Sequence, residues 1–160
     1  MKKELNIKIT LDSEDDYRNP FNKGKLSTEL SNYIYEECKG EPLNTDILIA
    51  IVPSFEMTKK EKEELIDMIR KNYGIDVKED LLFLERSFIW KTILFLLGVF
   101  IVAISYFIKT VDDYVISEVI LIIGWVAIWE SVYSWIFEDG KKKVEIKRLK
   151  RLANCKIEFK

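Results

Sequence analysis

The chain of 160 residues has no histidine and only two cysteines, three prolines and six glycines. The absence of histidine excludes a Ser-His-Asp triad, imidazole acid–base catalysis and histidine metal ligands. No G-x-x-x-x-G-K-[ST], G-x-G-x-x-G, C-x-x-C or G-x-S-x-G motif occurs either. We therefore expect a protein that is not an enzyme and that holds no metal or cofactor.

Charge is scarce in the middle of the chain, where two long apolar runs follow each other. Residues Thr92 to Ile108 are 17 positions without a charge, which at about 1.5 Å per residue nearly cross a hydrocarbon core of about 30 Å. Phe88 to Trp90 complete this span, with Lys91 snorkelling to the headgroups. The second run extends from Tyr114 to Phe137. We predict a transmembrane hairpin over 87–138, with spans at about 88–108 and 114–137; the alternative is a buried helical hairpin in a soluble domain.

The flanks of the hairpin predict its orientation. Basic residues precede the first span, and residues 141–160 hold nine basic and two acidic side chains, whereas the turn 109–113 holds only Lys109. The positive-inside rule therefore predicts both termini in the cytoplasm and the turn outside. The predicted basic flank at the inner leaflet comprises Lys141, Lys142, Lys143, Lys147, Arg148, Lys150 and Arg151. Aromatic residues expected in one interfacial belt are Trp90, Trp129, Tyr133 and Trp135.

Residues 1–86 alternate between strand and helix patterns, which predicts a small cytoplasmic α/β domain. Strands are expected at 4–11 and 47–52, where apolar residues alternate or run continuously before a proline. Helices are expected from the cap Ser27 to Gly40 and over 59–73, with a capping box at the start of the second. Gly74 is expected to end that helix, and Ile75 with Val77 to form a short strand. This region is acidic, with 14 basic and 19 acidic residues, so non-specific nucleic-acid binding is not expected.

The segment 139–160 follows the hairpin. Asp139-Gly140 is expected to break the second membrane helix. Lys141 to Leu152 predicts a basic helix that lies near the inner leaflet or extends the second span. The plain alternative is a solvated stalk with an ordinary positive flank. In the final residues, Cys155, Ile157 and Phe159 alternate with charged residues. We predict that this strand joins the N-terminal sheet, because two strands alone are only marginally stable.

The fold class is thus an α+β membrane protein with a two-helix transmembrane hairpin. Both cysteines, Cys38 and Cys155, are expected to be buried thiols.

Small residues recur at seven-residue intervals in both apolar runs, which is typical of helix–helix contacts in membranes. The stripes either close the hairpin within one chain or assemble an oligomer. The candidate packing residues are Gly98, Ser105, Ser117, Gly124 and Ala127.

Two carboxylates interrupt the second run. The ordinary interpretation of Glu118 and Glu130 is snorkelling at the two interfaces, because each lies within about two turns of a span end. The sharper hypothesis is that Glu130 faces an intersubunit seam or a water-filled path. The candidate pore or seam residues are Glu130, Ser131, Ser134 and Glu118.

Several segments resemble a group of small two-span bacterial membrane proteins of unknown function. The resemblance rests on Ile122-Ile123-Gly124-Trp125, Trp129-Glu130, Lys156-Ile157-Glu158-Phe159, Pro53-Ser54-Phe55-Glu56-Met57 and Ile69-Arg70-Lys71-Asn72-Tyr73-Gly74. More loosely, a cytoplasmic domain on a two-span hairpin resembles the transmembrane effectors of bacterial antiphage systems of the Hailong type. That resemblance is architectural and implies an oligomeric channel-like effector under a nucleotide-type signal.

These observations lead to two function hypotheses. The first is an oligomeric, channel-like effector in the bacterial inner membrane, gated by its cytoplasmic domain and active in antiphage defence. The second is a non-conducting anchor or scaffold that recruits a cytoplasmic partner. The expected partners are the lipid bilayer, further copies of the chain, and a cytoplasmic protein or nucleotide-type regulator.

Overall fold

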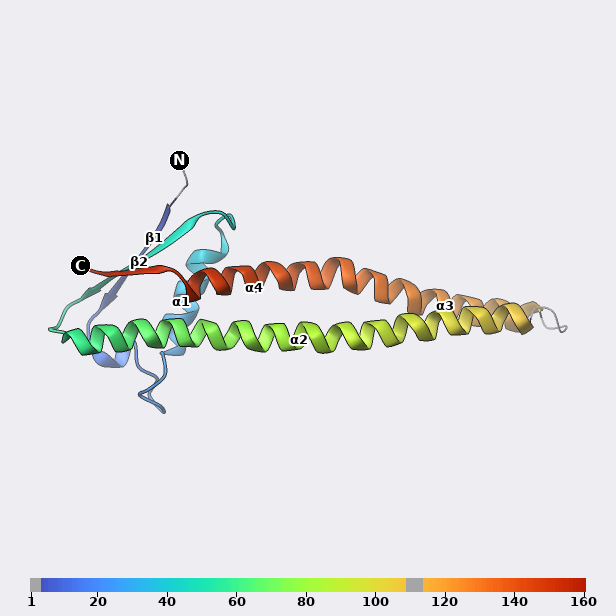
Figure 1. The fold of residues 1–160 in the computed structure, drawn as a ribbon, viewed down its shortest axis with the longest axis horizontal. Coiled ribbons are helices and arrows are strands. Elements are labelled where there is room, and N and C mark those ends of the chain that lie inside the picture. The colour runs from blue at the N-terminus through green and yellow to red at the C-terminus, as the bar shows by residue number, and fades with distance from the viewer. Residues whose placement is uncertain (1–3, 109–113) are drawn as a thin grey trace. The chain divides into compact units, whose positions relative to one another are not determined.

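The computed structural model describes residues 4–108 and 114–160 of an α+β chain (Figure 1). The chain divides into two compact units. Met1–Glu79 and Glu145–Lys160 form the first, which we call the sheet unit, and Asp80–Val144 form the second, the helical unit. The predicted turn at 109–113, with its predicted position outside the cell, lies outside the described residues.

Three parallel strands in the order β1-β2-β3 form the sheet. In β1 (Glu4–Leu11), Ile7, Ile9 and Leu11 are buried and the residues between them are exposed. In β2 (Asp46–Pro53), five consecutive apolar residues from Ile47 to Ile51 are buried, as in a central strand. Both strands were predicted from these patterns, and both are confirmed.

The third strand comes from the far end of the chain. β3 (Lys156–Phe159) pairs with β2, with Ile157 beside Ile49 and Phe159 beside Ile51. The Lys160 amide extends the pairing by donating to the Ile51 carbonyl over 2.9 Å. The prediction that the C-terminal strand joins the N-terminal sheet is confirmed.

The core of the sheet unit lies between the sheet and three helical segments. α1 (Thr28–Lys39) begins at Ser27, whose side chain accepts the Leu30 amide, as predicted. The other two segments are the first turns of α2 (Lys59–Ile108) and the last turns of α4 (Asp139–Ala153). In α2, the Tyr73 hydroxyl donates to the Ser31 carbonyl of α1 (2.8 Å); in α4, Glu145 accepts from the Tyr35 hydroxyl of α1 (3.4 Å). Helical residues buried in this core are Leu30, Ile34, Cys38, Leu65, Met68, Ile69, Tyr73, Val77, Ile146, Leu149 and Leu152.

The second helix is much longer than predicted. α2 runs over Lys59–Ile108, so the predicted end at Gly74 and the predicted short strand at Ile75 and Val77 are wrong. A glycine ends a helix by taking a left-handed conformation, which Gly74 does not adopt. Tyr73 and Val77, one turn apart, are both buried on the apolar face of the helix. Their packing outweighs the cost of about 1 kcal/mol for a glycine inside a helix.

The break predicted at Asp139-Gly140 is also wrong. α3 (Tyr114–Tyr133) is followed by a π-helical turn, η2 (Ser134–Glu138), and then by α4 (Asp139–Ala153). Asp139 keeps helical backbone angles, with φ −65° and ψ −32°, so the chain continues as a helix. The predicted basic helix from Lys141 to Leu152 lies within α4 and is confirmed.

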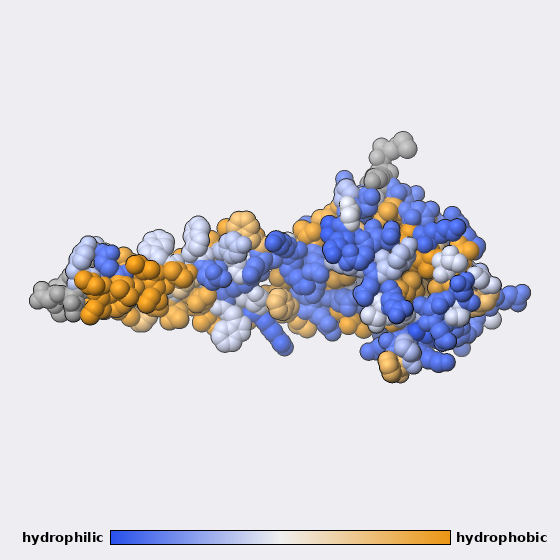
Figure 2. Space-filling model, turned by 180° about the vertical axis from the view of Figure 1, so that it is seen from behind, coloured by the Kyte–Doolittle hydropathy of each residue, from blue (hydrophilic) through white to orange (hydrophobic). Residues whose placement is uncertain are grey.

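The surface of the helical unit is strongly apolar. Two helical stretches, Lys59–Ile108 and Tyr114–Ala153, are long and apolar enough to cross a membrane. Apolar side chains gather over them in Figure 2. Large exposed side chains here include Phe100, Phe107, Val115, Ile122, Trp125 and Val126, each at least 57% exposed.

Removing β3 tests the completed sheet. A chain that stops at Cys155 loses Ile157 and Phe159, which are half-buried against β2. We expect a loss of about 2 kcal/mol in the sheet unit, and hence about thirtyfold faster cleavage of residues 4–53 by thermolysin, because cleavage follows the population of opened molecules. Lys156→Gln, which removes only the exposed ion pair with Glu158, is the matched control. Equal proteolytic resistance of the truncated and full chains would contradict this role for β3.

Candidate functional site

Two glycines bring α2 and α3 close together within the helical unit. A Cβ atom added to Gly98 of α2 would lie 2.9 Å from the Gly124 carbonyl oxygen and 2.8 Å from Ile128 Cγ1. A Cβ atom on Gly124 of α3 would lie 3.0 Å from the Gly98 carbonyl oxygen. Because backbone atoms stand in the way, only glycine allows this contact between the two helices.

The other small residues of the two stripes are buried as well. Ser105 and Ser131 donate to carbonyl oxygens of their own helices, those of Val102 (2.7 Å) and Ala127 (2.9 Å), so both hydroxyls are satisfied. Ser117 is also buried, and Ala127 is half-buried. In this structure the glycine contact joins two helices of one chain. The seven-residue spacing allowed either such a contact within one chain or a contact between chains in an oligomer.

Substitution of Gly98 tests this contact. Gly98→Ala should destabilise the helical unit by about 1–3 kcal/mol, because the helices must separate to admit a methyl group. The readout is the midpoint of thermal unfolding in detergent, followed by tryptophan fluorescence. Gly140→Ala is the control, since no atom other than those of its chain neighbours and its own helix backbone lies within 4 Å of its Cβ position and alanine favours a helix. A midpoint for Gly98→Ala at or above that of the control would contradict the contact.

An ion pair links α2 to the start of α4. Lys91 Nζ lies 2.6 Å from Asp139 Oδ1 and 3.5 Å from Glu138 Oε2, and its side chain is only 12% exposed. Glu138 also accepts a hydrogen bond from the Ser134 hydroxyl. The Lys91 ammonium group is thus held within the helical unit by two carboxylates just beyond the second apolar run. Its predicted snorkelling to the headgroups stays a prediction. A lysine in the first run and an aspartate just after the second were the sequence signal for this pair.

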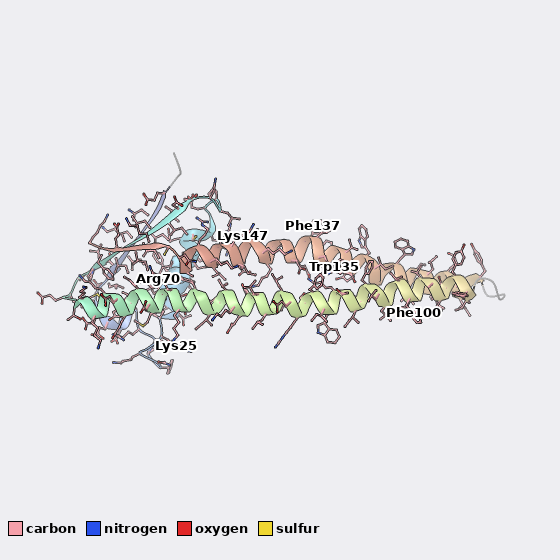
Figure 3. All side chains as sticks on the ribbon, viewed as in Figure 1. Lys25, Arg70, Phe100, Trp135, Phe137 and Lys147 are labelled. Carbon is pink, nitrogen blue, oxygen red and sulfur yellow. The ribbon has the colours of Figure 1, made fainter. Side chains whose placement is uncertain are left out.

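The π-helical turn lies directly beside this ion pair. π-Helical turns are rare and frequently occur at functional sites. The turn contains Trp135, whose ring packs against Phe95 (centroids 5.5 Å apart) and Phe88 (6.1 Å) of α2. Figure 3 shows Trp135 on the side toward α2 and Phe137 on the opposite side. Trp135 thus packs between the helices, in contrast to Trp90 and Trp129, which are 72% and 69% exposed.

A double-mutant cycle tests the ion pair. Lys91→Met leaves Asp139 buried without its cation, and we expect a loss of about 3–5 kcal/mol in unfolding free energy. Adding Asp139→Leu should recover much of the loss, because no unpaired charge then remains. Unfolding in detergent is the measurement, with Lys141→Met as the exposed control. Additive effects of the two substitutions would show that the groups do not interact.

The two carboxylates of the second apolar run lie away from the glycine contact. Glu130 is exposed and Glu118 half-exposed, and neither has an ion-pair or hydrogen-bond partner among the described residues. Of the other candidate pore residues, Ser131 and Ser134 are buried. The structure of one chain therefore separates Glu130, on the outer surface, from the serines, which face inward.

The predicted basic flank divides into two groups. Lys142 pairs with Asp80 at 2.8 Å, Arg151 donates to the Pro42 carbonyl at 3.2 Å and to that of Thr45, and Arg148 is half-buried. These residues contact the protein itself. The remaining members are exposed and are Lys141, Lys143, Lys147 and Lys150.

The sheet unit offers little reactive chemistry. Among the described residues, no group of three or more acidic or cysteine side chains is arranged to hold a metal. Burial raises the pKa of the Cys38 thiol and raises that of Cys155 to about 11. Raised thiol pKa values leave little reactive thiolate near neutral pH. The loop after β1 carries acidic residues from Asp12 to Asp16. One of them is structural, since the Asp16 carboxylate accepts the amides of Asp12 and Ser13, which lowers its pKa.

Comparison with protein-family models, curated proteins and solved structures gives no match.

Proposed function

We propose that the chain is a membrane protein whose two apolar helices cross the bilayer as a hairpin and carry the sheet unit in the cytoplasm. The observation that carries the proposal is the exposure of the apolar surface. Only 6% of the most apolar window of α2, and 17% of that of Tyr114–Ala153, is buried. The core helices of a soluble protein would be mostly buried, because exposed apolar area costs about 25 cal/mol per Å² in water.

The direction of insertion follows from the charges on either side of the apolar segments. Exposed lysines follow the second segment, and positive flanks remain on the cytoplasmic side. Exposed Trp90 and Trp129 belong to the interfacial belt at this end of the hairpin. A bacterial inner membrane, with both termini inside, fits this arrangement and the resemblance to two-span bacterial proteins.

Within this class we propose an oligomeric, channel-like effector gated by the sheet unit. Two observations support it. Glu130 is an exposed carboxylate on the apolar surface, and carboxylates within membrane segments usually face a bundle interior or a water-filled path. Strand β2 directly precedes α2, and β3 directly follows α4. A regulator that changes the pairing of β2 with β3 would therefore act on the chain at both membrane helices, and an antiphage role under a nucleotide-type signal is consistent with this connectivity.

The second candidate is a non-conducting scaffold that recruits a cytoplasmic protein. It is favoured by Phe21, which is 97% exposed at the tip of a loop. The loop is ordered: the Asn19 side chain accepts the amides of Phe21 and Asn22, and Arg18 donates to the Lys23 carbonyl at 2.9 Å. An ordered loop that presents an aromatic side chain to solvent is suited to insertion into a pocket of another protein.

Conductance measurements separate these candidates. We expect the full chain, reconstituted in planar bilayers, to conduct cations, and Glu130→Gln to reduce cation preference, because the substitution removes negative charge from the path. Glu79→Gln, which removes an exposed carboxylate outside the apolar runs, is the matched control. A chain that enters bilayers as an oligomer but never conducts would overturn the channel and leave the scaffold; identical currents for wild type and Glu130→Gln would remove Glu130 from the path.

A further inference from the structure

A groove of about 460 Å³ opens on the helical unit between α2 and the start of α4. It lies beside the ion pair of Lys91 and Asp139, and Asp139 forms part of its wall. The other lining residues are three apolar side chains and two charged ones: Leu84, Phe88, Ile89, Glu85 and Lys143.

The two remaining charges of the groove are available to a ligand. Asp139 is neutralised by Lys91 at 2.6 Å, and Lys142, next to the groove, is occupied by Asp80. Glu85 and Lys143, by contrast, are exposed and have no ion-pair partner among the described residues. The groove therefore presents one free negative and one free positive charge.

The order of chemistry along the groove matches the boundary of a membrane. Phe88 and Ile89, at 57% and 58% exposure, adjoin the charge-free run of α2. Glu85 precedes Phe88 by about one helical turn, and Lys143 follows Asp139 by about one turn. Both free charges are thus displaced along their helices away from the apolar runs, as a headgroup is displaced from acyl chains.

We propose that this groove binds a glycerophospholipid of the inner leaflet with an ethanolamine headgroup. The lipid phosphate pairs with Lys143, the ammonium group donates to Glu85, and the acyl chains lie over Phe88 and Ile89. The inference rests on the proposed membrane insertion of the helical unit, but not on conductance. A bound lipid would contact α2 and α4 together and so stabilise their packing beside the π-helical turn.

The free charges also define the specificity of the groove. A choline headgroup has no N–H to donate to Glu85, so it forms a weaker contact with this carboxylate. A glycerol headgroup brings the phosphate charge without a cation, and Glu85 then remains unpaired beside an anion. We therefore expect the order phosphatidylethanolamine, then phosphatidylcholine or phosphatidylglycerol.

Native mass spectrometry of the full chain released from nanodiscs tests this order. With equal amounts of the three lipids, the retained adduct should be mainly phosphatidylethanolamine. Lys143→Gln and Glu85→Gln should each reduce this adduct about tenfold, as expected for the loss of a charge-assisted contact of about 1.4 kcal/mol. Glu85→Lys should shift the preference to phosphatidylglycerol. Lys141→Gln and Glu79→Gln, which change exposed charges outside the groove, are the matched controls.

Equal retention of the three lipids, or equal losses in the groove and control variants, would overturn the lipid site. Failure of the proposed membrane insertion gives a different result, because the chain would then be extracted from membranes by alkaline carbonate. A chain that resists extraction yet shows no lipid preference retains its membrane assignment and loses the groove.

Discussion

The parallel pairing of β2 with β3 is the interaction on which the rest of the molecule depends. It joins a strand that precedes the helical unit in the sequence to a strand that follows it. The sheet unit is therefore complete only when both ends of the chain meet. Closing such a long connection costs entropy that rises only slowly with length. The cost is offset by burying the continuous apolar run of β2 in the core of the sheet unit. The fold therefore couples the sheet to both apolar helices through the chain itself.

The helical unit uses two different devices to hold its helices together. Gly98 and Gly124 bring the backbones into contact within the apolar segment. In the proposed membrane setting this close packing matters, because the hydrophobic effect does not distinguish a helix neighbour from lipid. Lys91 and Asp139 add a charged contact at one end of the same unit, next to Trp135 and the π-helical turn. The glycines provide close packing, and the ion pair favours one register of α2 against α4. Glu130, Glu85 and Lys143 are not used by either device, and these residues carry the functional proposals.

Local pattern predicted much of this fold and less of the candidate site. The alternation in Leu5 to Leu11 and in Cys155 to Phe159 identified two strands, and the marginal stability of a two-strand sheet identified their common sheet. Gly74 and Gly140 were wrongly predicted to end helices. A glycine indicates a helix end only from local preference, and it does not show that the turns around it are held by contacts with other parts of the chain. The seven-residue spacing identified Gly98 and Gly124, but spacing does not distinguish a partner helix in the same chain from one in another. Lys91 pairs with Asp139, which directly follows a π-helical turn. No local signal in residues 134–138 predicted that turn.

The central claim is that both ends of the chain occupy one compartment and build one sheet, while the apolar helices cross the membrane between them. Cysteine labelling with a membrane-impermeant maleimide on intact spheroplasts tests it most directly, and the buried native thiols of Cys38 and Cys155 should give little background. Asp112→Cys should be labelled from outside, whereas Phe21→Cys and Asn154→Cys should be labelled only after permeabilisation. Labelling of all three from the same side, or of Phe21→Cys and Asn154→Cys from opposite sides, would contradict the account.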